Sequence, residues 1–117
     1  MAQPYLAMLS QMIVSLELPI SKSVVLECKH FFSGAALYAD GQICASLTPA
    51  GFGLKLPKEV RDRMIDEGEG EELKYFENAP VKREYISLSQ AKMEDQKIFT
   101  SLLTQSIEYV RERGHAT

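Results

Sequence analysis

The chain has 117 residues, 45% of them hydrophobic, which suits one globular domain with an ordinary core. Its formal net charge of −3 disfavours a protein that binds nucleic acid by overall charge, because neutralising phosphates needs a basic face. No charged segment precedes the first apolar run, and the apolar runs are too short to cross a bilayer. We therefore expect a cytoplasmic protein, whose two cysteines are free thiols.

The first element we expect is an amphipathic helix. Apolar residues recur every three or four positions between Tyr5 and Leu16, which places them on one helical face. Pro4 suits a first helical turn and Leu18-Pro19 favours extended backbone, so the helix is expected from about Pro4 to Ser15. Its methionine-rich stripe fits either core packing or a groove for a partner.

A strand is predicted next, because residue character alternates from position 24 to position 32. The more apolar set, expected to face the core, is Val24, Leu26, Cys28, His30 and Phe32. Cys28 and His30 would then point the same way, as the nucleophile and base of a thiol enzyme or as two metal ligands. A zinc site needs four ligands and only Cys44 and His115 remain, so a small apolar role for Cys28 is the other interpretation.

The middle of the chain predicts a β-meander. Asp40-Gly41 favours the positive φ angles of a tight hairpin turn between apolar runs at 35–38 and 43–47. Thr48 to Gly51 is a second turn signal, and Phe52 to Leu56 alternates as a third strand. The glycine spacing matches neither a Walker loop nor a dinucleotide fingerprint, so we interpret these glycines as turn residues.

A second helix is expected to begin at Pro57 and end near Gly68. Its basic residues, with others nearby, form a candidate partner surface made of Lys55, Lys58, Arg61, Arg63, Lys82 and Arg83. Such a surface could bind phosphate or an acidic partner. Asp62 and Asp66 interrupt it, so an ordinary solvated helix face is the alternative.

The remaining elements are a hairpin and a last helix. Residues 66–72 are rich in Glu and Gly and predict a mobile acidic loop, followed by strands at 73–77 and 81–88. The hairpin aromatics Tyr75, Phe76 and Tyr85 would stack across the strands, or would serve nucleic-acid stacking. A helix is expected from about Glu94 to Arg113, stopped by Gly114, with an apolar band wide enough to meet the first helix or a second subunit.

Four segments resemble a known family. The runs Phe31-Phe32-Ser33-Gly34, Leu37 to Gln42, Leu54-Lys55-Leu56 and Glu84 to Leu88 resemble the TfoX N-terminal domain family in order and spacing, from about Val24 to the last helix. That family typically shows a Met-Phe-Gly-Gly stretch, an Ile-Tyr-x-Asp-Gly-Lys hairpin and a Leu-Tyr-Leu-Lys-Val strand. Here Ser33 replaces the first glycine of the pair, and Ala36 and Cys44 stand where other residues are usual.

Together these patterns predict one α+β domain over residues 1–117, with an antiparallel sheet of five or six strands and N-terminal, middle and C-terminal helices. The resemblance implies a bacterial regulatory module linked to natural competence, acting beside a DNA-bound transcription factor. We therefore expect a non-enzymatic protein-interaction module without cofactor or metal, whose candidate partners are a transcription regulator or a second copy. The alternatives are direct nucleic-acid binding through the candidate partner surface and a thiol enzyme that uses Cys28 and His30.

Overall fold

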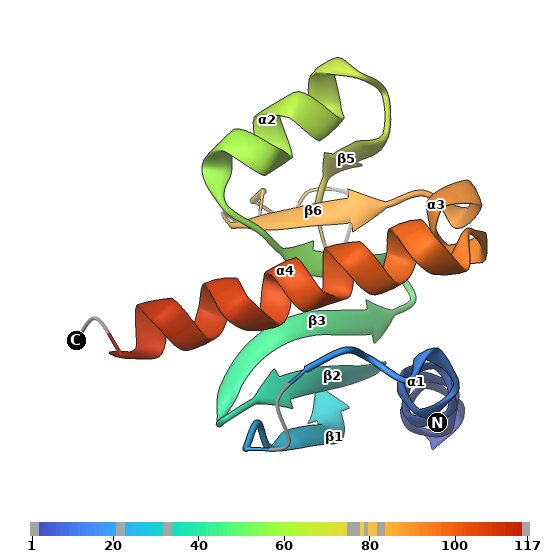
Figure 1. The fold of residues 1–117 in the computed structure, drawn as a ribbon. Helices are drawn as coiled ribbons and strands as arrows, with labels where there is room; N and C mark the ends of the chain where they lie inside the picture. The colour runs from blue at the N-terminus through green and yellow to red at the C-terminus, as the bar shows by residue number, and fades with distance from the viewer. Residues whose placement is uncertain are drawn as a thin grey trace.

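The computed structural model describes residues 3–20, 23–31, 34–74, 78, 80–81 and 84–115, which form one open antiparallel sheet with helices packed against it (Figure 1). The elements in chain order are α1 (Gln3–Leu16), β1 (Leu26–Phe31), β2 (Gly34–Ala39), β3 (Gln42–Thr48), β4 (Gly51–Lys55), α2 (Lys58–Asp66), β5 (Gly70–Glu72), β6 (Tyr85–Leu88), α3 (Gln90–Glu94) and α4 (Gln96–His115). The strand order is β1-β2-β3-β4-β6-β5. The α+β class and the six-stranded sheet confirm the expected architecture.

The turn between β2 and β3 is the one that the Asp-Gly pair predicts. Asp40 has a φ of 49° and Gly41 a φ of 82°, so both residues occupy the left-handed region that a primed hairpin turn requires. The Asp40 carboxylate also holds neighbouring segments in place. Its Oδ1 accepts a hydrogen bond from the Val25 amide at 2.8 Å, and its Oδ2 pairs with Arg111 Nε at 2.7 Å.

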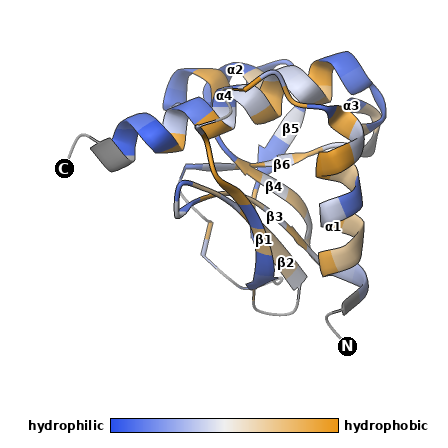
Figure 2. Ribbon diagram, turned by 60° about the horizontal axis from the view of Figure 1, so that its bottom comes forward, coloured by the Kyte–Doolittle hydropathy of each residue, from blue (hydrophilic) through white to orange (hydrophobic). Residues whose placement is uncertain are grey.

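The core lies between the sheet and the two long helices. Helix α4 runs across the middle strands, α1 lies beside it over β1 and β2, and the apolar faces of both helices turn inward (Figures 1 and 2). Leu9 from α1 and Leu103 from α4 are fully buried against this face. The Phe52 and Phe99 rings meet edge to face, with centroids 5.2 Å apart and planes at 77°, which is a favoured aromatic geometry.

A buried polar contact joins α4 to β3. Ser106 Oγ donates a 2.9 Å hydrogen bond to the Cys44 carbonyl oxygen, and Cys44 Sγ donates to the Leu37 carbonyl at 3.4 Å. Both Cys44 and Ser106 are fully buried. Burial raises the pKa of the Cys44 thiol to about 12, because a thiolate would lose its hydration there, and the neighbouring Cys28 adds to the rise.

The centre of the opposite face of the sheet carries small residues and is covered in part by one leucine. Ser46 and Gly53 are buried and pair across β3 and β4. Leu73, which is 1% exposed, packs so closely on Gly53 that a Cβ at this glycine would lie 2.6 Å from Leu73 Cδ2. Only glycine therefore admits Leu73 without displacing it.

The strand predicted at 73–77 is wrong where it can be compared with the structure. Leu73 and Lys74 lie outside any strand, residues 75–77, with Tyr75 and Phe76, lie outside the described part of the chain, and β5 occupies residues 70–72 instead. Part of the expected acidic loop is thus an edge strand. Gly70 explains this, since its missing side chain lets β5 approach Ile86 of β6 closely.

The last helix also begins and ends later than expected. Asp95 interrupts it, with a ψ of 99°, and its Oδ1 accepts a 3.2 Å hydrogen bond from the Ile98 amide. Asp95 therefore caps the start of α4 and separates it from the short helix α3. At the other end α4 continues through Gly114 to His115, so Gly114 does not stop the helix.

The buried Cys44 thiol predicts a loss of stability in alkaline solution. Its pKa is about 9.0 when unfolded and about 12 when folded, so above pH 9 the unfolded chain releases a proton that the folded chain retains. Between pH 8 and pH 10 the free energy of unfolding, measured by urea titration, should therefore fall by about 1.4 kcal/mol more in the wild type than in Cys44→Ala.

The comparison uses the change with pH, so the packing loss in Cys44→Ala does not affect it. The control Cys28→Ala should keep most of the wild-type slope, because Cys28 is only half-buried. Equal slopes in the wild type and Cys44→Ala would contradict the assigned ionisation.

Candidate interaction pockets along helix α4

The structure places Cys28 and His30 on the same strand but not in a shared enclosed site. Cys28 is half-buried and His30 is exposed, so the expectation that His30 faces the core is wrong. The reason is position, since His30 lies near the end of the edge strand β1. Burial raises the pKa of the Cys28 thiol, although a hydrogen bond with Ser10 lowers it in part. A raised pKa makes a thiol a poorer nucleophile at neutral pH.

Metal binding and membrane crossing find no support among the described residues. Within residues 3–20, 23–31, 34–74, 78, 80–81 and 84–115, no cluster of three or more His, Cys, Asp or Glu side chains is arranged to hold a metal ion. No helix in that part of the chain combines the length and the apolar character that a bilayer span requires.

Of the candidate partner surface, the structure describes Lys55, Lys58, Arg61 and Arg63. Lys58 Nζ pairs with Asp62 at 2.7 Å, Arg61 Nε donates to the Leu56 carbonyl at 2.9 Å, and Lys55 Nζ lies 5.4 Å from the centre of the Tyr85 ring. Lys82 and Arg83 lie outside the described residues. Arg63 is exposed and has a different setting, because it borders a pocket shared with α3 and α4.

This pocket, which we call the α2–α4 pocket, has a volume of about 360 Å³. Its lining residues are Arg63, Met64, Glu69, Lys92, Lys97, Ile98, Ser101, Leu102 and Gln105. Met64 and Leu102 are buried and supply an apolar floor, while Ile98 is 36% exposed. The rest of the lining is polar or charged. The pocket thus combines apolar contact with charge.

Positive charge dominates this pocket. Three cations from three helices border it, against the single carboxylate of Glu69. Lys92 Nζ holds that carboxylate at 2.9 Å, and this hydrogen bond is the largest contribution that lowers the Glu69 pKa. Arg63 and Lys97 are exposed, so their charges are available to a bound group. In a chain of net charge −3, the α2–α4 pocket is a local site of opposite sign.

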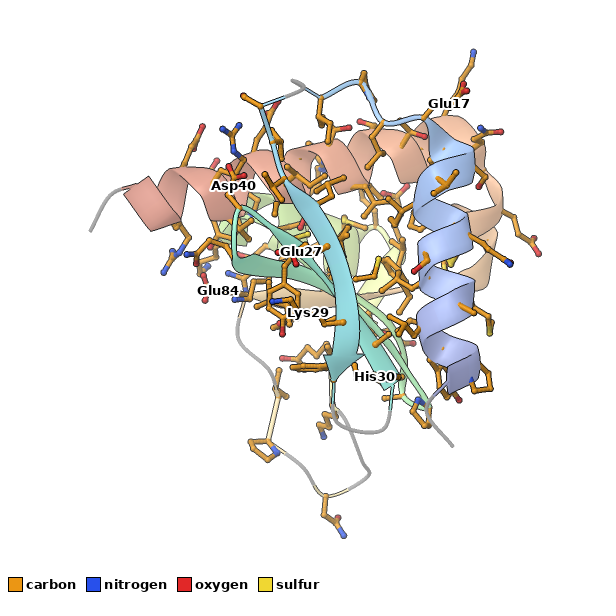
Figure 3. The ribbon with its side chains drawn as sticks, turned by 90° about the horizontal axis from the view of Figure 1, so that it is seen from below. Glu17, Glu27, Lys29, His30, Asp40 and Glu84 are labelled. Atoms are coloured by element: carbon orange, nitrogen blue, oxygen red, sulfur yellow. The ribbon has the colours of Figure 1, made fainter. Side chains whose placement is uncertain are left out.

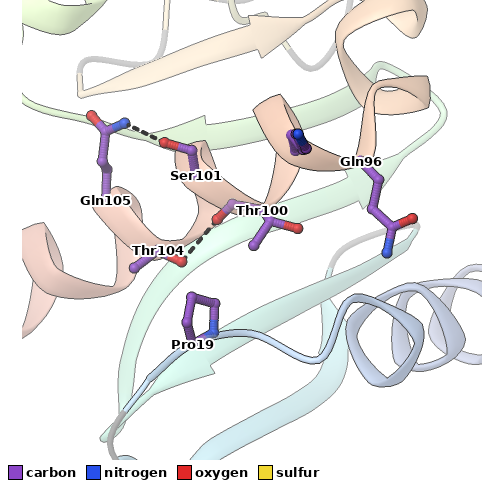
Figure 4. A pocket seen from close by; sticks show the side chains of 7 residues that line it. Pro19, Gln96, Thr100, Ser101, Thr104 and Gln105 are labelled. Carbon is purple, nitrogen blue, oxygen red and sulfur yellow. Dashed lines mark hydrogen bonds between the residues drawn. The ribbon is translucent and has the colours of Figure 1, made fainter.

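A shallower groove of about 690 Å³ lies on the other side of α4, between that helix and the segment around Pro19 (Figure 4). Three of its polar side chains form hydrogen bonds within the helix. Thr104 Oγ1 donates to the Thr100 carbonyl at 2.8 Å, and Gln105 Nε2 donates to Ser101 Oγ at 3.2 Å. Lys97, Ser101 and Gln105 line both depressions, so they form a ridge between two grooves.

Sequence reasoning singled out Arg63 but missed the other charged residues of the α2–α4 pocket. Glu69, Lys92 and Lys97 come from separate segments, and no periodicity or motif links them to Arg63. One feature of the sequence could have indicated them. Lys97 lies in the first turn of α4, where a helix favours acidic residues, and another lysine, Lys92, lies in α3.

Comparison with known proteins identifies the family of the chain. No curated protein shows a significant sequence match to the chain. The family described as the TfoX N-terminal domain matches residues 22–110, which include all the described strands and α4 as far as Val110. Because this match covers most of the 117 residues, the chain belongs to the TfoX N-terminal domain family.

Proposed function

We propose that this TfoX N-terminal domain is a non-enzymatic protein-interaction module, and that its partner binds in the α2–α4 pocket. The observation that carries the proposal is the composition of that pocket, with an apolar floor of Met64 and Leu102 and a cationic rim of Arg63 and Lys97. Peptide segments that carry a carboxylate beside an apolar side chain complement both features. The partner proposed is therefore a protein that presents an acidic, partly apolar segment.

The family supports a regulatory setting for this interaction. Membership in a family associated with natural competence favours a role beside a transcription regulator over a metabolic one. The net charge of −3 and the local pairing of Lys58 with Asp62 favour a protein partner over direct contact with DNA. The raised pKa of both thiols favours a role without nucleophilic catalysis.

Peptide binding tests the pocket directly. The probe is a fluorescently labelled octapeptide of alternating Asp and Leu, titrated with the protein and followed by fluorescence anisotropy. Wild type should bind it saturably, and the double variant Arg63→Glu/Lys97→Glu should bind at least about tenfold more weakly, because reversing both rim charges replaces attraction with repulsion.

The matched control is Lys58→Glu, a charge reversal on α2 outside the pocket, which should leave the affinity within about twofold. A Lys-Leu peptide should not bind. Equal losses in Lys58→Glu and the double variant would reduce the effect to overall charge and contradict the proposal. Tight binding of a DNA duplex with a steep salt dependence, lost in the same variants, would favour nucleic-acid binding instead.

Thiol labelling tests the non-enzymatic part of the proposal. At pH 7.5 Cys28 in the folded protein should react with a maleimide more slowly than the cysteine of a peptide copy of residues 24–32, because its raised pKa leaves less thiolate. The measurement uses the folded variant Cys44→Ala, in which Cys28 is the remaining cysteine, so that the labelling rate is that of Cys28 alone. A Cys28 that reacts faster than the free peptide would support a thiol enzyme and contradict this proposal.

A further inference from the structure

Strand β1 forms one edge of the sheet and has a second long side that no described strand occupies. Figure 3 looks onto this edge and shows β1 in front of the other strands, with α1 to one side. Glu27, Lys29 and His30, labelled along the strand, are all exposed.

The hydrogen-bond pattern identifies the backbone groups that point outward. Val25 pairs with Asp40, since the Val25 carbonyl accepts from the Asp40 amide and the Val25 amide donates to the Asp40 side chain, both at 2.8 Å. Bonding sides alternate along an antiparallel strand, so Glu27, Lys29 and Phe31 bond to β2. The amides and carbonyls of Leu26, Cys28 and His30 therefore face the open edge.

The outward-facing backbone groups of Leu26, Cys28 and His30 are arranged symmetrically about Cys28. The side chains on either side of Cys28 carry opposite charges. If two copies pair antiparallel about a two-fold axis at Cys28, Glu27 of each copy lies directly opposite Lys29 of the other. On the same face Val25, which is 58% exposed, lies opposite Phe31 of the second copy. Opposite charges and apolar pairs at such positions stabilise a sheet.

Neighbouring registers lack this complementarity. An axis at Glu27 sets two glutamates against each other, and an axis at Lys29 does the same with two lysines, which is destabilising. Axes at Leu26 or His30 pair fewer residues of the strand. Charged residues often keep edge strands apart. Here, however, the opposite charges are two positions apart, so one register turns them into attractive pairs.

We propose that two copies of this chain associate through β1, antiparallel and centred on Cys28, so that their sheets become continuous. The inference is independent of the α2–α4 pocket, because none of the β1 residues line it. It also assigns the second copy to an edge strand, in place of the broad apolar band of α4 considered from the sequence.

Charge exchange tests the register. Sedimentation equilibrium of the wild type, from low micromolar to millimolar concentration, should show a monomer–dimer equilibrium. Glu27→Lys and Lys29→Glu should each weaken association about tenfold or more, because each creates two like-charge contacts per dimer. Mixing the two variants should restore association as a heterodimer, and the double exchange Glu27→Lys/Lys29→Glu should restore the homodimer.

The controls are Glu112→Lys on α4 and Lys74→Glu, exposed charge reversals elsewhere on the surface, which should associate like the wild type. Monomer at every concentration would overturn the proposal. So would a dimer whose affinity is the same in all variants, because its interface would then lie elsewhere.

Hydrogen exchange supplies a readout at the level of single amides. The amides of Leu26, Cys28 and His30 should become protected as the wild-type concentration rises, and should stay unprotected in Glu27→Lys. The amides of Glu27 and Lys29 should be protected in both, because they bond to β2. Protection that rises uniformly along the strand, without this alternation, would contradict antiparallel pairing at the edge.

Discussion

The contact between α4 and β3 is the constraint on which the rest of this structure depends. A twenty-residue helix can lie flat on a sheet only where the strands present small side chains, and β3 does so with Cys44 and Ala45. The hydrogen bond from Ser106 to the Cys44 carbonyl then fixes the helix in register with the strand. Beyond Ser106, side chains from the second half of α4 form ion pairs with two loops that connect or precede strands. Arg111 binds Asp40 at the β2–β3 hairpin, and Arg113 binds Glu84 at 3.1 Å, just before β6.

Elements governed by local chemistry were the ones that the sequence could predict. The Asp40-Gly41 turn needs only two residues that tolerate positive φ, and α1 needs only a stripe of apolar residues at helical spacing. Strand β5 was missed because its cause is tertiary: Gly70 allows close approach to Ile86, and no alternating pattern marks it. Leu73 fits an alternating pattern and therefore predicts a strand. In the structure its apolar side chain instead packs against Gly53 on the face of the sheet.

The candidate site likewise has features that the local sequence predicts and features that only tertiary packing creates. Sequence reasoning grouped basic residues by proximity along the chain, but the fold gives Lys55, Lys58 and Arg61 separate local contacts. The α2–α4 pocket is assembled by tertiary packing from two separate segments, residues 63–69 and 92–105, which no spacing rule detects. The two thiols are the opposite case, because the sequence drew attention to them but the structure places them in settings that disfavour reactivity. Cysteine is a nucleophilic residue type, yet burial raises the pKa of both thiols, which favours their interpretation as small apolar groups in the packing of the sheet.

The positions of the two proposed surfaces have a consequence for binding. Strand β1 is at one edge of the sheet and β5 at the other, and α2, which supplies Arg63 to the pocket, packs against β5 (Figure 1). Two copies joined at β1 therefore carry their α2–α4 pockets at the distant ends of one continuous sheet. A partner with a single acidic segment gains nothing from such a pair. A partner that is itself paired, with two segments spaced to reach both pockets, gains affinity through the effective concentration of the second site. Edge pairing would then select paired partners over single ones without adding any contact to the pocket itself.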